Sequence, residues 1–578
     1  MKNYSPFKNL FQFCAFLLVI SINCSAPSEG DRWIKQTIKN MSIEEKVGQL
    51  VDLWLDAREI GKDTCIEEKI NEIKNYHIGS YMFLMIPGDM YAIAQGVQRL
   101  QEVSKIPLII GTNSEGGAGG FVTQAVRFPT QMAMGATRDS ALTYQAGRIM
   151  ALESKALGVD MACIPNGSLN NNPNNPVINV RAFSDDPKLA AQMVVAYVRG
   201  LQDHGFPAQV GLFPGHGDTE VDSHLSLPTL NVQSRDRLFS TELVPFIAAF
   251  DAGCSSVMTA HVIIPFLDPK NPATLSKIII TDLLRKELHF DGLVYTDAIR
   301  MKAITNHYGV GESAVLSLTV GNDVLVWPSD YKTVIDSVLA AVRSGRLMEA
   351  RLDESLRRRF RVKVMAGVHK YTPHPIENLE SKIGLPEYRE IAQKIADKAI
   401  TVAKDEDGLI PIKNLKETAF LMLGGNPTIG KEILDSFPGC PVLNVVEKEK
   451  GESLEIDPDP SRPAKGAKKI PVTTEKAKQE ILQRLLKKQF IMVASFLGRG
   501  STLEQNRGYF EILEYLIKSG KKVCLISLGD PYIYRFTPFI QTYVCGYGSE
   551  DFIRWATWKV LKGTIQASGQ LPIKIPGL

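Results

Sequence analysis

Short apolar runs alternate with amphipathic stretches between about residue 40 and residue 368. A short apolar run bounded by polar residues is typical of a buried β-strand, and apolar side chains that recur on one face predict an α-helix. The expected strands are residues 48–55, 78–85, 106–112, 159–165, 207–213, 254–260, 291–296 and 322–327. Helical patterns between them include residues 137–156, 186–203, 234–252 and 273–288. Eight such units predict a (β/α)8 TIM-type barrel, which we assign to residues 31–368.

The pattern of apolar runs changes after residue 368. Residues 369–400 begin with a proline-containing stretch and run into a helical pattern at 387–404, so they are expected to connect two domains. Strand and helix patterns then alternate again, which predicts a smaller αβα sandwich domain with a mostly parallel sheet over residues 401–578. Its expected strands are 418–423, 489–496, 522–528 and 541–545, and its expected helices are 429–436, 475–487, 508–519 and 550–562. Residues 447–474, rich in Lys, Glu, Pro and Asp, are expected to form an exposed loop.

The amino terminus carries the features of an export signal. Lys2 and Lys8 precede an apolar run from Leu10 to Ile22, which is too short for a membrane-spanning helix. Residues 1–24 are therefore expected to be a signal peptide. The run ends at Cys24, which resembles the lipid-bearing residue of a bacterial lipoprotein, and plain cleavage and secretion is the alternative. In both cases we expect an exported protein, either periplasmic or anchored to a membrane through a lipid.

Charge and cysteine usage narrow the range of partners. The 66 basic and 63 acidic side chains leave a net charge of only +3, which gives no basic surface for nucleic acid and favours a small, carbohydrate-like partner. The cysteines beyond the expected signal are widely spaced, which favours buried free thiols over a disulfide framework or a zinc site. They are Cys65, Cys163, Cys254, Cys440, Cys524 and Cys545.

Residues 211–228, with the sequence GLFPGHGDTEVDSHLSLP, combine three glycines and two prolines with no apolar periodicity. Such a stretch predicts a bent polar loop at the surface or over a cleft. In an extended segment residues i and i+2 project to the same side, so Asp222 is expected to hold one ring nitrogen of His224 and to make the imidazole a proton donor and acceptor. Two alternatives stay open: the polar side chains only fix the turns, or they bind a metal. The ligand set would be His216, Asp218, Asp222 and His224.

Further polar side chains follow the expected strands, at the face where a (β/α)8 barrel carries its active site. They include Asn113, Glu115, Asn166, Arg181 and His261. Asp297 follows the apolar run GLVYT and is expected to place one carboxylate at the mouth of the barrel. A catalytic role is favoured, and the alternative is an N-cap of the helical stretch AIRMKAI. The opposite ends of the strands carry no comparable set of residues.

Six long motifs carry a family resemblance: FPGHGDTEVDSHLSLP, NNNPNNPVINVRAF, VMTAHVIIPFLDPKNPATLSK, FDGLVYTDAIRMKAI, AITVAKDEDGLIPI and ASGQLPIKIPG. Together they resemble the bacterial β-N-acetylglucosaminidases of glycoside hydrolase family 3, in their two-domain form. The resemblance covers almost everything after residue 35. Chance agreement over motifs of this length is remote.

The resemblance implies a retaining, exo-acting hydrolase that removes terminal non-reducing N-acetyl-β-D-glucosamine from peptidoglycan or other glycan fragments. It implies that Asp297 is the nucleophile and that His224, paired with Asp222, is the acid/base in place of a second carboxylate. A mobile loop would carry His224 over the bound sugar. The residues implied to bind the sugar are Arg181, His261, Asn113 and His216. No cofactor and no metal are implied.

This chain departs from the family pattern at several sugar-binding positions. Relatives usually place Asp at Asn113, Arg at Ala118, Asp at Ser168, and a Lys-His pair at Gly211 and Leu212. Each lost hydrogen bond to a charged partner is worth roughly 1.5–3 kcal/mol, so an impaired family member that binds or scaffolds glycans is the alternative function. Activity is favoured because the residues implied to do the chemistry are intact, and phosphorolysis stays open beside hydrolysis. The second domain is expected to be structural, because its loops carry no paired carboxylates or His-Asp pair.

Overall fold

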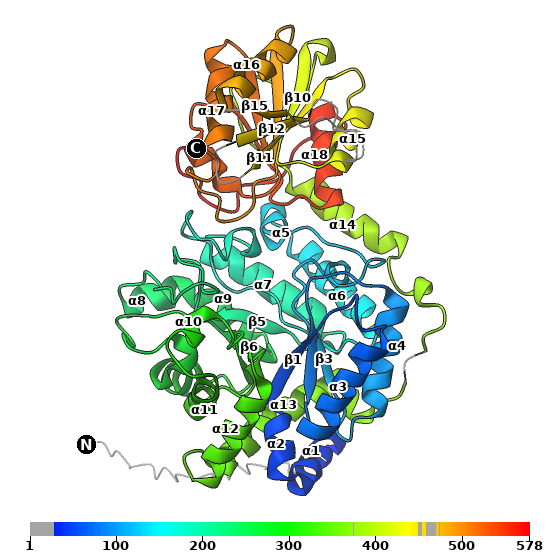
Figure 1. Cartoon of the computed structure of the whole chain (residues 1–578), viewed down its shortest axis with the longest axis vertical. Coiled ribbons are helices and arrows are strands. Elements are labelled where there is room, and N and C mark those ends of the chain that lie inside the picture. The colour runs from blue at the N-terminus through cyan, green and yellow to red at the C-terminus, as the bar shows by residue number, and fades with distance from the viewer. Residues whose placement is uncertain (1–27, 374, 449–452, 458–469, 473) are drawn as a thin grey trace, which may run out of the picture.

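The computed structural model describes residues 28–373, 375–448, 453–457, 470–472 and 474–578. The expected signal at residues 1–24, with Cys24, lies outside the described residues, so export and lipid anchoring stay predictions. Within the described part, no helix has both the length and the apolar character that crossing a membrane requires. Figure 1 shows a larger body of blue to green elements and a smaller body of yellow to red elements above it.

The larger body is built on parallel strands that run in chain order around a barrel. They are β1 (Val51–Leu55), β2 (Ser80–Phe83), β3 (Ile109–Thr112), β4 (Met161–Ala162), β5 (Gln209–Phe213), β6 (Ser256–Thr259), β7 (Leu293–Thr296) and β8 (Leu325–Val326). Ladders join β4-β3-β2-β1-β8 and β5-β6-β7. Single parallel bridges, Ala162 to Ala208 and Tyr295 to Val324, link the two sets. The expected (β/α)8 barrel is thereby confirmed, and each strand lies inside its expected range.

Helices surround these strands, and local sequence explains where they begin. Asp186 accepts from the backbone N–H groups of Lys188 and Leu189, and Pro187 occupies the first helical turn of α7. The α-helices of this body are α1 (Glu29–Asn40), α2 (Ile43–Gly48), α3 (Asp63–Tyr76), α4 (Met90–Glu102), α5 (Gln131–Thr137), α6 (Ser140–Ala156), α7 (Pro187–Gln202), α8 (Arg235–Arg237), α9 (Val244–Asp251), α10 (Lys302–Thr305), α11 (Val310–Val320), α12 (Tyr331–Arg343) and α13 (Glu349–Ala366). The expected helix at 273–288 is the 3₁₀ turn η4 (Ala273–Leu275) followed by the π-helix η5 (Ile278–Glu287).

The amino ends of the strands form a floor that is packed and ionic. Val362 of α13 lies among inward-facing apolar side chains of the barrel strands. Beside it, the buried Asp323 accepts from Arg285, Arg351 and Arg358 at 2.6, 3.0 and 3.3 Å. The expectation that this end carries no polar set comparable to the mouth is wrong, because charged side chains from η5 and α13 are buried there in pairs.

The smaller body is an α/β sandwich around one mixed sheet. Its strands are β9 (Thr401–Asp405), β10 (Thr418–Leu423), β11 (Val442–Lys448), β12 (Ser453–Asp457), β13 (Ile470–Val472), β14 (Phe490–Ser495), β15 (Lys522–Ser527) and β16 (Thr542–Cys545), in the order β13-β12-β11-β10-β14-β15-β16-β9. The central strands, in the spatial order β11-β10-β14-β15-β16, are parallel, and β12, β13 and β9 pair antiparallel at the edges. Its helices are α15 (Pro427–Ser436), α16 (Thr474–Leu485), α17 (Arg507–Lys518) and α18 (Asp551–Lys562). The expected αβα sandwich with a mostly parallel sheet is confirmed.

Two boundaries in the second half differ from expectation. The helix expected at 387–404 is α14 (Pro386–Ala399), which stops where the β-branched residues Thr401 and Val402 begin β9. The segment 447–474 is not simply an exposed loop. Its described residues include the end of β11 and the strands β12 and β13, which pair antiparallel at the edge of the sheet. Backbone pairing at a sheet edge overrides the polar composition of this segment.

Candidate active site

Asp297 lies directly after β7 at the mouth of the barrel. Its backbone N–H donates to the Thr259 carbonyl at the end of β6 (3.1 Å), and the Ala298 N–H donates to its Oδ1 at 2.7 Å. The side chain is half-buried. Asp297 is not the N-cap of α10, since that helix begins at Lys302 after Met301. The carboxylate is therefore held by its own loop with one oxygen directed by a backbone donor.

Asp222 and His224 form a hydrogen-bonded pair on the polar loop. Asp222 Oδ1 accepts from the His224 backbone N–H at 2.8 Å and lies 2.7 Å from His224 Nδ1. Because a carboxylate only accepts, Nδ1 carries the hydrogen and Nε2 is left as the working nitrogen. Partial burial raises the pKa of Asp222, but the hydrogen bonds from His224 outweigh it, and the net pKa is lowered. The His224 side chain is 65% exposed, so Nε2 is open to a ligand.

Ser223 fixes the position of this loop over the strand ends. Its carbonyl accepts from the Ala303 backbone N–H at 3.3 Å, and Ala303 belongs to the segment that follows β7. Its hydroxyl lies 3.1 Å from Nε2 of the buried His216. The loop that carries His224 is thereby tied to the segment that carries Asp297.

His216 and His261 lie beneath the site instead of facing it. His216 Nδ1 lies 2.9 Å from Thr219 Oγ1, and its Nε2 is occupied by Ser223. His261 Nε2 donates to the Ala298 carbonyl (3.2 Å), while its Nδ1 contacts Thr274 Oγ1 at 2.8 Å. Both residues are fully buried. Both ring nitrogens of each are engaged by protein atoms that hold the loops of the candidate acid/base and the candidate nucleophile, and direct sugar binding by His216 and His261 stays a prediction.

Electrostatics links these groups. Burial lowers the pKa of His216 to about 4, and the negative charge of Asp297 opposes that shift. Burial also lowers the pKa of His261, against the charge of Asp297, and the charge of His224 adds to the lowering. Since His261 feels both Asp297 and His224, the nucleophile candidate and the acid/base candidate lie around one site.

Arg181 and Glu115 form an ion pair at the same face. Arg181 is the last residue of the 3₁₀ turn η2 (Asn179–Arg181) in the long loop after β4, and its Nε donates to Glu115 Oε1 at 2.6 Å. Its Nη1 donates to the Val177 carbonyl at 3.2 Å. The pair is partly exposed, with 24% of the arginine side chain and 18% of the glutamate side chain accessible. The remaining guanidinium donors are therefore available to sugar hydroxyls.

The positions that depart from the family pattern take structural roles or stay unpaired. Leu212 is buried in the apolar core, and Ala118 is fully buried. Ser168 Oγ accepts from the backbone N–H of His216 at 3.1 Å, so it supports the polar loop. Asn113 keeps a buried Oδ1 for which the described residues supply no hydrogen-bond donor. That oxygen is an acceptor suited to a ligand hydroxyl.

Two candidate binding residues were not identified from the sequence. Trp54 and Asp52 lie two residues apart on β1, so their side chains project to the same side of the strand. Asp52 points into the barrel and meets Arg359 at 2.6 Å, and Trp54 is 43% exposed near the mouth. The alternation of side chains along β1 could have indicated Trp54. Arg499, from the loop after β14, donates to the Val177 carbonyl at 3.0 Å. No pattern in the sequence pointed to Arg499, because the packing of the two bodies brings it there.

The metal alternative finds no support among the described residues, where no three His, Cys, Asp or Glu side chains gather in a way that could hold an ion. Asp218 instead meets Asn172 (3.3 Å) and lies 3.9 Å from Arg237. The six cysteines beyond the expected signal carry free thiols, four of them buried.

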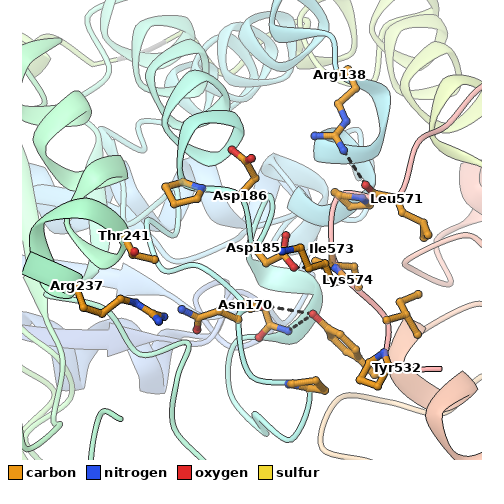
Figure 2. Close-up of a pocket in the computed structure, with 16 residues that line it drawn as sticks. Arg138, Asn170, Asp185, Asp186, Arg237, Thr241, Tyr532, Leu571, Ile573 and Lys574 are labelled. Carbon is orange, nitrogen blue, oxygen red and sulfur yellow. Dashed lines mark hydrogen bonds between the residues drawn. The ribbon is translucent and has the colours of Figure 1, made fainter. Parts of the chain in front are cut away.

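One pocket lies between the two bodies and is lined by none of the catalytic candidates. It has a volume of about 720 Å³. Figure 2 shows the carboxy-terminal segment along it, with Arg138 donating to the Leu571 carbonyl (2.7 Å) and Asn170 bonded to the Tyr532 hydroxyl (2.9 Å). These contacts join the second body to the turn between α5 and α6 and to the long loop after β4, so the pocket is part of the interface.

Comparison with known proteins agrees with this architecture. The family model described as glycosyl hydrolase family 3 N terminal domain matches residues 42–362. A β-N-acetylglucosaminidase/β-glucosidase of Cellulomonas fimi is 29% identical over 423 residues, which cover 70% of this chain and 72% of that protein. β-Hexosaminidase A of Pseudoalteromonas piscicida is 30% identical over 352 residues, 56% of this chain and 58% of that protein.

Solved structures extend the similarity to both bodies. A glycoside hydrolase family 3 β-N-acetylglucosaminidase from a Paenibacillus species superposes with a TM-score of 0.78 at 29% identity, over 93% of this chain and all of that one. A β-glucoside phosphorylase gives the same TM-score at 24% identity, over 95% of this chain and 97% of that one, and is similar in fold.

Proposed function

The chain belongs to glycosyl hydrolase family 3, and on that premise we propose that it is a retaining exo-β-N-acetylhexosaminidase that releases terminal non-reducing N-acetylglucosamine. One observation carries the proposal. His224 is held by Asp222 through Nδ1 (2.7 Å), with Nε2 exposed, on a loop tied to the segment that follows Asp297. The names of the relatives from Cellulomonas fimi and Pseudoalteromonas piscicida support the substrate.

In the first step the free carboxylate oxygen of Asp297 attacks the anomeric carbon. The bond between that carbon and the glycosidic oxygen breaks, and His224, which enters this step with a hydrogen on each ring nitrogen, donates the Nε2 proton to the departing oxygen and keeps the Nδ1 hydrogen on Asp222. Asp222 stabilises the ring orientation through Nδ1. The product of this step is a glycosyl ester on Asp297 and a free alcohol.

In the second step a water molecule replaces the departed alcohol. His224 Nε2 takes one proton from that water, and the oxygen attacks the anomeric carbon. The ester bond to Asp297 breaks, and the carboxylate is regenerated. Two inversions at the same carbon leave the product with the β configuration of the substrate.

The use of an imidazole as acid/base suits the charges of this site. A second carboxylate beside Asp297 would disfavour ionisation of both groups, whereas an imidazole adds no negative charge and leaves the nucleophile anionic. Arg181 and Asn113 would grip the sugar, Arg181 through its spare donors and Asn113 through its unpartnered Oδ1. Trp54 would offer an aromatic face to the ring.

We further propose peptidoglycan or other glycan fragments as the substrate of an exported, lipid-anchored or periplasmic protein. A catalytically impaired glycan-binding protein is the second candidate, favoured by the loss of the Asp, Arg and Lys-His side chains at Asn113, Ala118, Gly211 and Leu212. The intact pair of Asp222 and His224, in bonded geometry, supports activity over that candidate.

The test is turnover of 4-nitrophenyl N-acetyl-β-D-glucosaminide, with proton NMR of the first sugar released. We expect turnover, a β-anomer as the first product, and loss of turnover in Asp297→Ala. A matched control is Asp291→Ala, which removes an exposed carboxylate at the other end of β7. Sugar binding without turnover of any β-hexosaminide would favour the impaired protein, and an α-anomer as first product would exclude retention.

A further inference from the structure

Two arginines from different bodies of the protein meet at one backbone carbonyl. Val177 lies in the long loop after β4, and its oxygen accepts from Arg181 Nη1 at 3.2 Å and from Arg499 Nη1 at 3.0 Å. Arg181 belongs to the barrel, whereas Arg499 belongs to the loop between β14 and α17. The second body therefore delivers a cation to the side of the barrel mouth where the sugar-binding candidates lie.

The two arginines differ in their charge balance. Arg181 is neutralised by Glu115 at 2.6 Å. Arg499 forms no ion pair with any described residue, and its guanidinium donates to a neutral carbonyl oxygen. A guanidinium has five N–H donors in a fixed fork, so most of those of Arg499 are left for a ligand. Arg499 is an exposed residue, which leaves those donors accessible.

The backbone that carries Arg499 is fixed against the barrel. Gly500 has a φ of +75° and packs so closely that a side chain there would meet Pro176 at 3.2 Å. Arg535 donates to the carbonyl oxygens of Pro173 and Ser501, which joins the barrel loop to the same second-body loop. The Ser501 hydroxyl closes the turn on the Gly498 carbonyl at 2.6 Å. Contacts from both bodies therefore hold the backbone that carries Arg499 in place.

Arg499 reaches the mouth of the barrel from outside, on a loop of the second body. Crowding by protein atoms lowers the pKa of Arg499, Arg181 lowers it further, and the negative charges of Glu115 and Asp222 oppose the shift. In an exo-acting hydrolase the terminal sugar lies against the half-buried Asp297 and the rest of the glycan extends outward, so an exposed side chain that arrives from the second body faces the leaving-group side. An unpaired cation at that place favours a negatively charged leaving group.

We propose that Arg499 is a specificity-determining residue contributed by the second body, and that it binds a carboxylate or phosphate substituent on the leaving-group side of the scissile bond. This inference rests on the proposed function. It changes the expected role of the second body from structural support to part of the substrate site. The bidentate fork of an arginine fits either oxyanion.

The test compares kcat/KM for 4-nitrophenyl and 3-carboxy-4-nitrophenyl N-acetyl-β-D-glucosaminide, which differ by one carboxylate on the leaving group. In Arg499→Gln we expect kcat/KM for the acidic substrate to fall roughly ten-fold or more, mainly through KM, and to change less than about two-fold for the neutral one. Arg499→Lys should restore part of the difference, because the charge returns without the fork. The matched control is Arg507→Gln, an exposed arginine of the same body that pairs with Glu511.

The outcomes separate the two proposals. No turnover of either substrate by the unaltered protein overturns the proposed function and this inference with it. Turnover of the neutral substrate with an acidic-to-neutral ratio that Arg499→Gln leaves unchanged overturns only the inference. An equal fall for both substrates would assign Arg499 to general sugar binding, and formation of sugar 1-phosphate from added inorganic phosphate, lost in Arg499→Gln, would assign it to free phosphate. Either result contradicts selection of an acidic leaving group.

Discussion

The two ends of the barrel contain the same kinds of charged side chains, but those at the floor are paired with one another and those at the mouth keep unpaired atoms. At the floor, Asp323 is fully buried and meets Arg285, Arg351 and Arg358. Against burial, the arginines lower the pKa of Asp323 to about 2. At the mouth, Asp297, His224 and Arg499 keep atoms that no described residue engages.

This difference teaches which charges stabilise the fold and which are kept for a ligand. A buried charge whose partners are complete contributes a fixed structure, and loss of one partner leaves a costly unpaired group. A charge that stays partly solvated at the carboxyl ends of the strands can form its strongest contacts with a substrate or a transition state. Changes at the mouth should therefore alter activity with little effect on stability, and changes at the floor should do the reverse.

The largest effect is expected from the acid/base at the mouth. General acid–base catalysis contributes roughly 10²–10⁴-fold, so His224→Gly should lower kcat for a poor leaving group by up to about 10⁴-fold. The loss in the bond-breaking step should be much smaller for a 2,4-dinitrophenyl leaving group, which needs no proton. Pre-steady-state rates with both substrates measure this. An equal loss for the two leaving groups would contradict the assignment of His224, and added azide should restore part of the rate in this variant.

The floor should show the opposite behaviour. Asp323→Asn removes the charge that three arginines share, so we expect the free energy of unfolding to fall by about 3–5 kcal/mol in denaturant titrations, with kcat of the folded protein unchanged. The control is Asp291→Asn, which also pairs with Arg358 but has 69% of its side chain exposed. Exposed pairs are worth about 0–1 kcal/mol. Similar losses for Asp323→Asn and Asp291→Asn would contradict the distinction.

His216 combines the two behaviours, because it is buried but supports the loop at the mouth that carries His224. Its folded pKa of about 4 lies below the unfolded value of 6.5, so its contribution to stability is present above pH 6.5 and is lost as pH falls toward 4. At about 1.4 kcal/mol per pH unit the loss approaches 3 kcal/mol. Unfolding curves at several pH values should show a shallower pH dependence in His216→Gln. The exposed His307→Gln should keep the slope of the unaltered protein, and an identical slope in all three proteins would refute the prediction.

The smallest effect is expected from Trp54 at the mouth. Aromatic contacts are worth roughly 0.5–1.5 kcal/mol, so Trp54→Ala should raise KM by about two- to ten-fold and leave kcat nearly unchanged. Trp555 on α18 is equally exposed, at 43%, and Trp555→Ala should leave KM unaltered. Steady-state kinetics distinguishes the two. A KM that responds to neither change would remove Trp54 from the sugar site.

Much of the fold and part of the site could be predicted from the sequence. The barrel strands follow from short apolar runs, and the pairing of Asp222 with His224 follows from their spacing, which the structure realises at 2.7 Å. The ionic floor could not be predicted, because Arg285 and Arg351 come from other elements of the chain than their partner Asp323. Composition alone treats such residues as solvent-facing.

The remaining misses have the same physical origin. The sequence shows that His216 and His261 are ligand types, but not that neighbouring hydroxyls and carbonyls already occupy their ring nitrogens. It likewise offers no sign that Arg499 crosses to Val177, because contacts between bodies leave no periodic pattern. Residues close in the chain, such as Asp222 and His224, were predictable, although these two lie in a turn and not in the expected extended segment. Residues brought together by packing were not.

The most direct measurement is peptide mass mapping of His224→Gly mixed with 2,4-dinitrophenyl N-acetyl-β-D-glucosaminide and quenched in acid. The activated leaving group departs without a proton, while hydrolysis of the ester needs the missing base, so the covalent species should accumulate. We predict one N-acetylhexosaminyl group on Asp297, absent in the double variant with Asp297→Ala. An unlabelled protein that still releases a burst of dinitrophenol, or a label on another residue, would contradict the role of Asp297 as nucleophile.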